Sequence, residues 1–542
     1  MSEGRVELDA VVVGAGFAGM YQLIKLSELG LTAKAFEAGD GVGGTWYWNR
    51  YPGARCDVES LEYSYGFSSE LEQEWVWTER YPTQPEIERY ANHVADRFDL
   101  RKDIQFETRV TAAHYDDATG RWHVDTDKGD RVSATYLVMA SGCLSHRQDP
   151  RDRFTGVDSF KGDWYHTAAW PKGGVDFTGK RVGIIGTGST AIQVIPQVAK
   201  QAEHLTVFQR TANFSVPAMN RLLSDEEQDA LKARYQEHRQ DAKESAFGVP
   251  VPMPTKGALE CTADEQFEAL ESRWQAGGVA PFMLAFTDVL INQGSNDVVA
   301  DFIRSKIRTT VKDPAVAELL CPNDHPLGTK RPCVDIDYFE TYNRDNVSLV
   351  SVRKTPIEEI TPNGIRTTEK EYELDAIVFA IGFDAMTGAL FDIDITGRDG
   401  LALTEAWKDG PRTYLGIMTA GFPNMFLITG PQSPSVLSNM MVSIEQHVEW
   451  LSDAIAYVRE RGLDTIEATT EAQDAWVDHS IEVGNSTLYP KANSWYMGAN
   501  VPGKVRVFTP YIGGVGPYRE KCNEVVAAGY EGFALSSSLA TA

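Results

Sequence analysis

Residues 11–19 read Val11-Val12-Val13-Gly14-Ala15-Gly16-Phe17-Ala18-Gly19, and this stretch decides the fold. The valines predict a buried strand, and the amphipathic stretch from Met20 to Leu29 predicts a helix after the glycine turn. In a dinucleotide-binding unit, the first glycine makes the tight turn and the second lets the pyrophosphate approach the backbone. The third lets the helix pack against the strand, so that the helix N-terminus faces the phosphates. Glycines also gather in ordinary turns, so the flanking elements matter to the prediction.

An acidic residue closes the next predicted strand, which runs from Leu31 to Phe36. Glu37 follows that strand about 20 residues after the turn, where a carboxylate accepts hydrogen bonds from ribose hydroxyls. The strand, the turn, the helix and the acid together predict a nucleotide site.

The same pattern recurs in the middle of the chain. Residues Arg181 to Ile185 predict a strand, and Gly186-Thr187-Gly188-Ser189-Thr190-Ala191 follows it. Alanine in the third position adds one methyl group, which the helix packing tolerates. The next strand, Leu205 to Phe208, is followed by Gln209-Arg210-Thr211, so an arginine replaces the acid. A carboxylate would repel a 2′-phosphate, whereas a guanidinium binds it through two parallel hydrogen bonds. We therefore expect FAD in the first unit and NADPH in the second; the alternative for Arg210 is a solvated surface charge.

Two such units in one chain imply electron transfer between a nicotinamide and a flavin. Two more apolar strands, in Tyr136 to Gly142 and Asp375 to Asp384, end in small-x-Gly turns. They predict the points at which the chain crosses between the domains; the alternative is two unrelated buried strands.

Residues 224–323 are rich in Glu, Gln, Lys, Arg and Ala and contain capping boxes at Ser224 and Thr262, which predicts a helical insertion.

The expected fold is α/β, with two Rossmann-like dinucleotide-binding domains and a helical insertion in the second. A chain of 542 residues is too long for one ordinary domain. The expected FAD-binding domain is discontinuous and comprises residues 1–150 and 383–542. The expected NADPH-binding domain comprises residues 151–223 and 324–382, and the insertion comprises residues 224–323.

Composition limits the partners. With 42% apolar and 24% charged residues, the chain is globular, and its formal charge of −26 argues against nucleic acid, because phosphate binding needs a basic surface. The longest apolar runs are strand length, far short of the roughly 20 residues that span a bilayer. The N-terminus has no basic region followed by an apolar stretch, so we expect a cytoplasmic protein without membrane contact.

Six cysteines lie far apart without a CxxC pair, so we expect buried thiols and no metal site; a lone catalytic cysteine is the alternative.

A motif ahead of the second glycine turn resembles that of a known family. Phe160, Gly162, His166, Trp170 and Pro171 fit the spacing FxGxxxHxxxWP, which resembles the fingerprint of single-chain, FAD-containing Baeyer-Villiger monooxygenases. Related flavin monooxygenases that oxidise nitrogen and sulfur usually lack the final Trp-Pro. The resemblance implies that His166 couples domain motion to catalysis and transfers no proton. By residue type alone, a histidine between aromatic residues is more often a packing residue.

The resemblance covers nearly the whole chain and looks closest to the phenylacetone and steroid monooxygenases. The other matching segments are Gly43 to Asp57, Lys330-Arg331-Pro332, Gly430 to Pro434 and Ser494 to Asn500. The sequence departs from the family pattern at Ala191, Ile381 and Gln432. Gln432 lies in a loop that resembles one beside the substrate, so this departure bears on substrate choice.

The resemblance implies a three-layer architecture similar to flavin monooxygenases and disulfide reductases. It also implies oxidation of ketones to esters or lactones by NADPH and oxygen through a flavin peroxide, with sulfoxidation as a side activity. Arg331 would stabilise the anions on this path, because a guanidinium stays charged and does not protonate the peroxide. Asp57 would orient Arg331. Taken alone, the two residues would be interpreted as a surface ion pair.

The resemblance also implies two sets of cofactor-binding residues. The FAD set comprises Gly14, Gly16, Phe17, Gly19, Glu37, Gly44, Thr45, Trp46, Asp57, Tyr63, Val110 and Met440. The NADPH set comprises Arg55, Gly186, Thr187, Gly188, Ser189, Thr190, Ala191, Gln193, Arg210, Thr211, Lys330, Arg331 and Trp495. Within the second set, Arg210 and Lys330 would hold the 2′-phosphate, and Trp495 matches a mobile loop over the nicotinamide.

Two other functions stay open at this point. One is a flavin monooxygenase that oxidises soft nitrogen or sulfur atoms, against which Trp170-Pro171 and Arg331 argue. The other is a flavin-binding redox sensor or electron carrier without an organic substrate. The expected partners are a small ketone and molecular oxygen, and the expected assembly is a monomer or a weak homo-oligomer.

Overall fold

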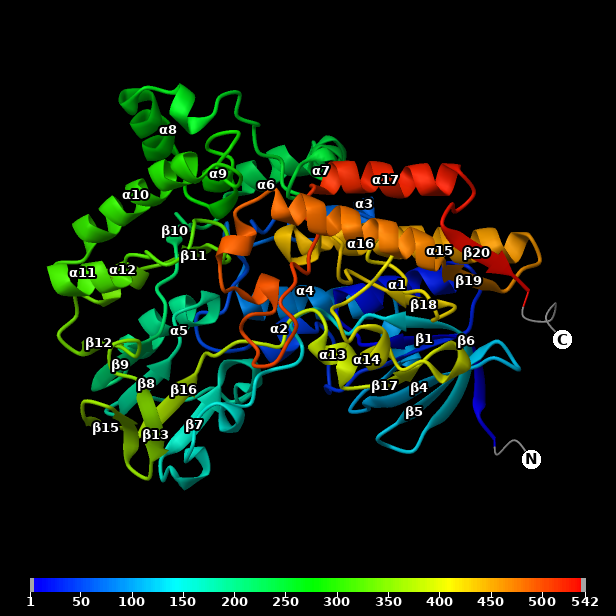
Figure 1. Cartoon of the computed structure of the whole chain (residues 1–542), viewed down its shortest axis with the longest axis horizontal. Helices are drawn as coiled ribbons and strands as arrows, with labels where there is room; N and C mark the ends of the chain where they lie inside the picture. The colour runs from blue at the N-terminus through cyan, green and yellow to red at the C-terminus, as the bar shows by residue number, and fades with distance from the viewer. Residues whose placement is uncertain (1–3, 538–542) are drawn as a thin grey trace.

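The first glycine turn follows a buried strand of the larger sheet (Figure 1). The computed structural model describes residues 4–537, so the N-terminal residues considered for a signal sequence lie partly outside it. Strand β1 (Val6–Val13) pairs in parallel with β2 (Ala33–Phe36) and β6 (Arg131–Met139). The order is β17-β4-β5-β6-β1-β2-β3, and β18 pairs with the end of β6. The other strands are β3 (Ile104–Gln105), β4 (Val110–Asp116), β5 (Arg121–Thr126), β17 (Asp394–Thr396) and β18 (Met425–Leu427).

Side chains that alternate along β1 contribute to two separate cores, one on each face of this sheet. Ala10 and Val12 pack with residues of helices α1, α4 and α15. Val11 and Val13 pack on the opposite face with residues of α13 and α14. The sheet is therefore the middle of three layers, which explains why its central strand is apolar on both faces. The helices are α1 (Phe17–Glu28), α4 (Gln84–Arg97), α13 (Gly388–Phe391), α14 (Leu403–Ala406) and α15 (Met440–Glu460).

The second glycine turn lies in a parallel sheet with the order β12-β9-β8-β16-β7. Val182 and Ile184 face the core that contains helix α5, whereas Ile185 faces a smaller core closed by a three-stranded antiparallel sheet. The parallel strands are β7 (Asp163–His166), β8 (Arg181–Ile185), β9 (His204–Gln209), β12 (Val347–Ser351) and β16 (Ala376–Phe379), and α5 is Ser189–Ala199. The covering strands are β13 (Ile357–Thr361), β14 (Gly364–Thr367) and β15 (Glu371–Glu373). The two Rossmann-like units predicted from the glycine turns are both present.

The chain crosses from the first sheet to the second after β6 and returns after β16. Each crossing strand is a parallel neighbour of the strand before a glycine turn, with Val138 beside Val12 and Val378 beside Ile184. The strands predicted as crossing points therefore occupy equivalent places in the two sheets.

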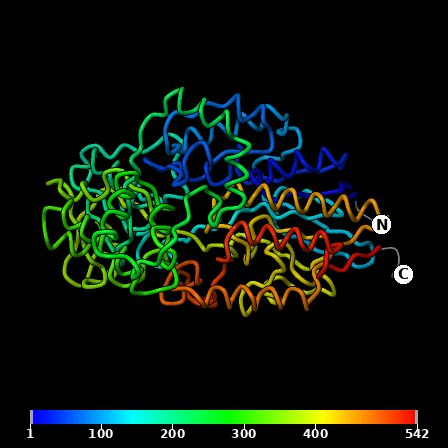
Figure 2. The backbone as a smooth tube through the Cα atoms, turned by 90° about the horizontal axis from the view of Figure 1, so that it is seen from above, coloured from blue at the N-terminus to red at the C-terminus, as the bar shows by residue number. Residues whose placement is uncertain are grey.

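The residues expected to form a helical insertion are helical and extend along one side of both sheets (Figures 1 and 2). Capping boxes begin α6 at Ser224 and α8 at Thr262, as predicted. Helix α7 packs against α17 (Val515–Ala527) beside the larger sheet, whereas α8 to α11 contribute to the core of the second sheet. The insertion helices are α6 (Asp225–Lys232), α7 (Tyr235–Glu244), α8 (Ala263–Ala276), α9 (Val279–Met283), α10 (Gln293–Thr310) and α11 (Pro314–Leu320).

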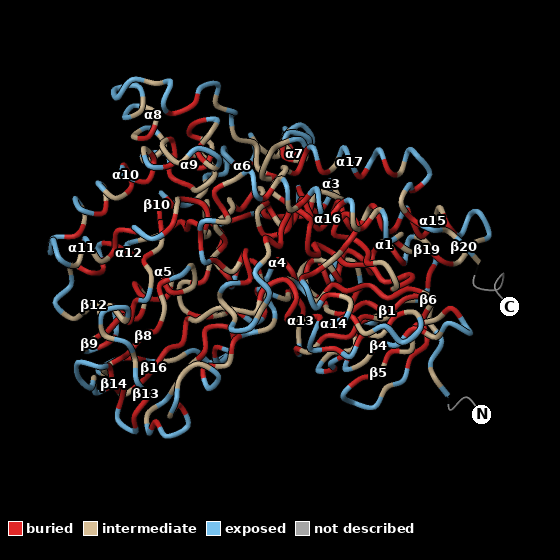
Figure 3. The backbone as a smooth tube through the Cα atoms, viewed as in Figure 1, coloured by how far each residue is buried: buried red, intermediate tan, exposed pale blue. Residues whose placement is uncertain are grey.

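Buried residues follow the strands of both sheets, and exposed residues lie in the outer helices and loops (Figure 3). Among residues 4–537, no helix has the length and apolar character needed to cross a membrane. The remaining helices are α2 (Thr45–Trp48), α3 (Ser69–Glu74), α12 (Tyr338–Thr341) and α16 (Thr470–Asn485). The remaining strands are β10 (Ser215–Pro217), β11 (Cys333–Asp335), β19 (Thr465–Ala468) and β20 (Phe533–Ser536).

Candidate active site

A cavity of about 950 Å³, called here the dinucleotide cavity, opens at the carboxyl ends of β1, β2, β6 and β18. Strand ends of an open, largely parallel sheet are where dinucleotides bind. The cavity wall contains every residue of the expected FAD set except Gly19, namely Gly14, Gly16, Phe17, Glu37, Gly44, Thr45, Trp46, Asp57, Tyr63, Val110 and Met440. These residues come from five separate stretches of the chain, and the fold brings them together around one space.

Close backbone approaches explain the glycines of the first turn. Gly14 has a φ of +103°, and a Cβ there would lie 2.7 Å from the carbonyl oxygen of Ala140. A Cβ on Gly16 would lie 3.4 Å from Cα of Gly44, across the floor of the cavity. A Cβ on Gly19 would collide with the carbonyl oxygen of Gly14, so Gly19 allows the helix to pack and does not line the cavity. The N-terminus of α1 has no acidic residue in its first turn, so it suits a pyrophosphate.

The carboxylate of Glu37 is buried at the cavity wall, with 5% of the residue exposed. Its Oε2 accepts a hydrogen bond from the Ala15 amide at 2.8 Å, and its Oε1 accepts one from the Gly39 amide at 2.7 Å. Each oxygen keeps a further lone pair for a ribose hydroxyl. Trp46 and Tyr63 meet on the same wall, where the indole Nε1 of Trp46 donates to the Tyr63 hydroxyl at 3.0 Å. The residues present therefore fit FAD.

The expected NADPH set divides into residues that line the dinucleotide cavity and residues that lie beyond it. The lining members are Arg55, Ser189, Gln193, Arg331 and Trp495. Gly186, Thr187, Gly188, Thr190, Ala191, Arg210, Thr211 and Lys330 lie outside its wall. Gly186, with a φ of +119°, lies against the carbonyl oxygen of Ala380, just as Gly14 lies against that of Ala140.

Two contacts tie the second turn to its surroundings. The Thr187 hydroxyl donates to the Thr211 carbonyl at 2.6 Å, so the turn is fixed to the end of β9. Gln193 connects α5 to the loop after α2, because its Oε1 accepts from the Tyr51 hydroxyl at 2.7 Å and its Nε2 donates to the Arg55 carbonyl at 2.9 Å. Ala191 is fully buried, so its methyl group is accommodated by the helix packing. This half of the structure fits a second dinucleotide.

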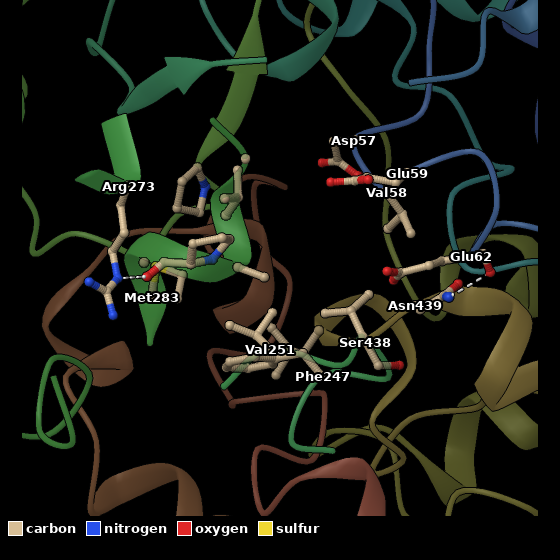
Figure 4. Close-up of a pocket in the computed structure, with 18 of the residues that line it drawn as sticks. Asp57, Val58, Glu59, Glu62, Phe247, Val251, Arg273, Met283, Ser438 and Asn439 are labelled. Atoms are coloured by element: carbon tan, nitrogen blue, oxygen red, sulfur yellow. Dashed lines mark hydrogen bonds between the residues drawn. The ribbon is translucent and has the colours of Figure 1, made fainter. Parts of the chain in front are cut away.

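A smaller cavity of about 490 Å³, called here the apolar cavity, adjoins the first (Figure 4). Carboxylates of Asp57, Glu59 and Glu62 lie on one side, and Val251 and Met283 lie on the other. Most of the wall comes from a loop of the insertion, from helix α9 and from the segment after β18: Phe247, Val249, Pro250, Val251, Pro252, Val279, Pro281, Met283 and Leu437. This volume falls within the roughly 300–1,000 Å³ typical of pockets for drug-sized ligands.

Arg331 and Asp57 lie where the two cavities meet, because both residues line both. Nε and Nη2 of Arg331 donate to the two carboxylate oxygens of Asp57, each at 2.8 Å. Nη1 donates to the Val436 carbonyl at 2.7 Å. The Arg331 side chain is 31% exposed and that of Asp57 is 21% exposed. The guanidinium is thus held in place on one edge by a carboxylate and remains accessible from the cavities.

Electrostatics keep Arg331 charged. Burial alone would lower the pKa of the guanidinium, but the Asp57 carboxylate outweighs burial and holds that pKa well above its usual value. Tyr496, which lines the apolar cavity, has its pKa raised to about 12 by burial, although Arg331 opposes that shift. The junction therefore contains one fixed positive charge and a neutral phenol at neutral pH.

The fingerprint residues lie around β7, at the edge of the second sheet. Phe160 and Trp170 are buried in two different cores, and a Cβ on Gly162 would collide with the Asp375 carbonyl. His166 is 4% exposed, and its Nδ1 accepts from the Ala168 amide at 3.0 Å. Burial, aided by Arg147, lowers the pKa of His166 to about 4, so the ring is neutral at pH 7. Neither His166 nor Trp170 lines a cavity, and Pro171 is exposed.

Two sequence-based expectations have different outcomes. Trp495 lies in a short 3-10 helix (Trp495–Met497) on the wall of the dinucleotide cavity. Gln432 lines neither cavity, so its side chain borders neither space, and its bearing on substrate choice stays a prediction. Its amide is buried, donating to the Pro411 carbonyl and accepting from Thr413, both at 2.8 Å. Leu437 and Ser438, a few residues later, line the apolar cavity instead.

Sequence reasoning missed most of the apolar wall. Phe247, Val249 and Val251 belong to no motif and lie in a loop, where neither periodicity nor spacing marks them. The signal that points to this loop is its alternation of valine and proline from Val249 to Pro252, which is unusual beside polar helices.

Comparisons with known proteins agree with this geometry. Residues 8–226 match the model of the FMO-like family, described as flavin-binding monooxygenase-like. A protein of Pseudooceanicola batsensis named Baeyer-Villiger monooxygenase is 46% identical over 97% of this chain and 95% of its own length. The acetone monooxygenase (methyl acetate-forming) of a Gordonia species is 43% identical over 98% of this chain and 99% of its own. The structure of an oxidised steroid monooxygenase bound to NADP is 54% identical, with a TM-score of 0.94 over 98% of this chain and all of that one.

Proposed function

The chain belongs to the Baeyer-Villiger monooxygenases, and from this premise we propose that it uses NADPH and molecular oxygen to convert ketones into esters or lactones. The observation that best supports this function is the position of Arg331, which borders both the dinucleotide cavity and the apolar cavity. A fixed cation at that junction lies between the cofactor space and the space for an organic substrate.

The residues of the first glycine turn, Glu37 and the Trp46–Tyr63 pair would hold FAD, and the second turn with Arg210 and Lys330 would hold NADPH. When bound together, the two cofactors supply the reducing electrons and the activated oxygen. The protein itself has three tasks, which are to bind the cofactors side by side, to exclude water and to stabilise negative charge.

Arg331 performs the last task. Negative charge develops on the carbonyl oxygen of a ketone under attack, and a preorganised donor stabilises such charge without reorganisation. Asp57 fixes the guanidinium through two hydrogen bonds of 2.8 Å, so Arg331 does not have to be ordered during the reaction. Because its pKa lies well above the usual value, Arg331 provides charge and does not act as an acid.

The apolar cavity supports a neutral ketone with a bulky apolar body as the substrate. Phe247, Val251 and Met283 offer apolar contact, and the cavity of about 490 Å³ holds more than a small ring. Sulfides of similar shape would fit the same space, which supports sulfoxidation as a side activity.

We further propose that the protein acts in the cytoplasm as a monomer or a weak homo-oligomer. All six cysteines are free, which suits a reducing compartment.

A panel of linear, aryl and cyclic ketones tests the proposed function. The expected result is a ketone-dependent rise in NADPH consumption, with an ester or lactone identified by mass spectrometry. A redox sensor would consume NADPH at the same rate with and without ketone. An enzyme for nitrogen and sulfur would oxidise amines and sulfides and leave every ketone unchanged.

A further inference from the structure

Cationic side chains gather at the carboxyl ends of two neighbouring strands in the second sheet. Arg210 directly follows β9, and Arg353 follows β12. The two strands run in parallel, with Ser351 of β12 beside Gln209 of β9. Arg353 and Thr211 each lie two residues after this pair, so the two residues lie beside each other just past the carboxyl ends of their strands.

Contacts fix Arg353 to the second glycine turn. Its Nη2 donates to the Thr211 hydroxyl at 3.1 Å and also forms an ion pair with Asp324. The Thr211 carbonyl accepts the Thr187 hydroxyl, so Arg353 is connected to the turn through a single residue. Nε and Nη1 of Arg353 donate no hydrogen bond to another residue within 4–537, which leaves these two nitrogens available to a ligand.

The local charge is positive in a chain whose net charge is −26. Burial lowers the pKa of Lys330, Asp324 opposes that shift, and the nearby cations Arg210 and Arg353 lower the pKa further. Burial and Arg210 also lower the pKa of Arg153. Arg210 therefore repels both Lys330 and Arg153, and Arg353 repels Lys330, whereas Asp324 is the carboxylate that acts on Lys330 and pairs with Arg353. Neither Arg210 nor Lys330 has an ion pair among the described residues, so the one carboxylate of Asp324 leaves the cluster with excess positive charge.

We propose that Arg353 is a third cation for the 2′-phosphate of NADPH, acting with Arg210 and Lys330 and positioned by Asp324 and Thr211. This inference rests on the proposed use of NADPH. A phosphate monoester is a compact dianion with three acceptor oxygens, and the free Nε and Nη1 of Arg353 can each donate a charged hydrogen bond to such an oxygen. Arg353 is about 140 residues from Arg210 in sequence and belongs to no motif, which explains why sequence reasoning did not select it.

The test is the binding of two nucleotides to the FAD-loaded protein by isothermal titration calorimetry. Adenosine 2′,5′-bisphosphate contains the 2′-phosphate, and adenosine 5′-monophosphate lacks it. The Arg353 side chain is 54% exposed, so solvent weakens its charge interactions. We expect Arg353→Ala to weaken binding of the bisphosphate by roughly three- to tenfold and to change binding of the monophosphate less than about twofold.

Two further variants separate this role from a general charge effect. Lys354→Ala removes the same charge from the next, exposed residue and is expected to change neither affinity by more than about twofold. Arg353→Lys is expected to recover only part of the lost bisphosphate affinity, because a single ammonium cannot replace both the nitrogen that contacts Thr211 and the free nitrogens of the guanidinium. Flavin absorbance and the melting temperature of each variant check that it is folded.

Three results would overturn the inference. Equal losses in Arg353→Ala and Lys354→Ala would indicate a bulk electrostatic effect, and equal losses for the two nucleotides would place Arg353 away from the 2′-phosphate. A wild-type protein that binds both nucleotides equally would contradict the NADPH assignment itself. The first two results would reject only the role of Arg353 and leave the proposed function intact, whereas the third would reject the use of NADPH.

Discussion

Replacing Arg331 with alanine is expected to abolish ester formation while the protein still folds and binds FAD. The change removes two hydrogen bonds of 2.8 Å to Asp57 and one of 2.7 Å to the Val436 carbonyl. Because Arg331 and Asp57 are partly exposed to the cavities, water can solvate the remaining carboxylate. The cost in folding stability should therefore be about 1–3 kcal/mol, which a chain of this size tolerates.

The cost to the reaction is larger. Loss of one preorganised donor to a developing oxyanion lowers the rate by about 10²–10³, or roughly 3–4 kcal/mol. Reduction of the flavin needs only the two cofactors side by side, so NADPH consumption should continue. The reducing equivalents should then appear as hydrogen peroxide. Arg331→Lys should recover little, because an ammonium lacks the planar fork and can donate a proton.

The assay follows NADPH by absorbance, hydrogen peroxide by a peroxidase-coupled dye and ester by gas chromatography in the same sample. Arg398→Ala is the matched control, because Arg398 pairs with Glu467 at 2.8 Å and lines neither cavity. The control should keep the wild-type ratio of ester to NADPH. If Arg331→Ala also kept that ratio at a near-normal rate, Arg331 would not be the catalytic group, and Asp57 would lose its role as its partner.

Three further predictions follow from the site. Arg210→Ala and Lys330→Ala should each raise KM for NADPH roughly ten- to a hundredfold and that for NADH much less, as steady-state kinetics with both donors would show. Val251→Trp should fill part of the apolar cavity and raise KM for bulky ketones while NADPH oxidation without ketone is unchanged; an equal effect on small and bulky ketones would contradict it. His166, with its pKa lowered to about 4 by burial, contributes stability that is fully present above about pH 6.5 and is lost as pH falls toward 4, because the unfolded chain then binds the proton first. Thermal melting should show this loss in the wild type and a smaller loss in His166→Gln; identical slopes would exclude His166 as its source.

Much of the fold was predictable because its signals are local. The strand, glycine turn and helix around Gly14 and Gly186 lie within single stretches of about 20 residues, and the two sheets form around them as expected. The crossing strands were predictable for a similar reason, because an apolar run that ends in a small-x-Gly turn has few places in such a sheet.

The site was less accessible to local reasoning. Asp57 and Arg331 are separated by 274 residues, and only the family resemblance suggested their pairing, which the structure contains as a two-bond contact. The wall formed by Phe247, Val251 and Met283 comes from a loop and from helix α9, whose positions depend on the packing of the insertion. Gln432 shows a further limit of local reasoning, because a loop that borders a cavity can direct one of its side chains into the protein interior.

The central claim is that one atom of molecular oxygen is inserted beside a ketone carbonyl at the junction occupied by Arg331. The most direct measurement is a single turnover of the NADPH-reduced, FAD-loaded protein with a bulky neutral ketone under isotopically heavy oxygen gas. Mass spectrometry should show an ester or lactone that contains one heavy oxygen atom, with the second reduced to water. Unchanged ketone beside heavy hydrogen peroxide, or an ester without the label, would contradict the account.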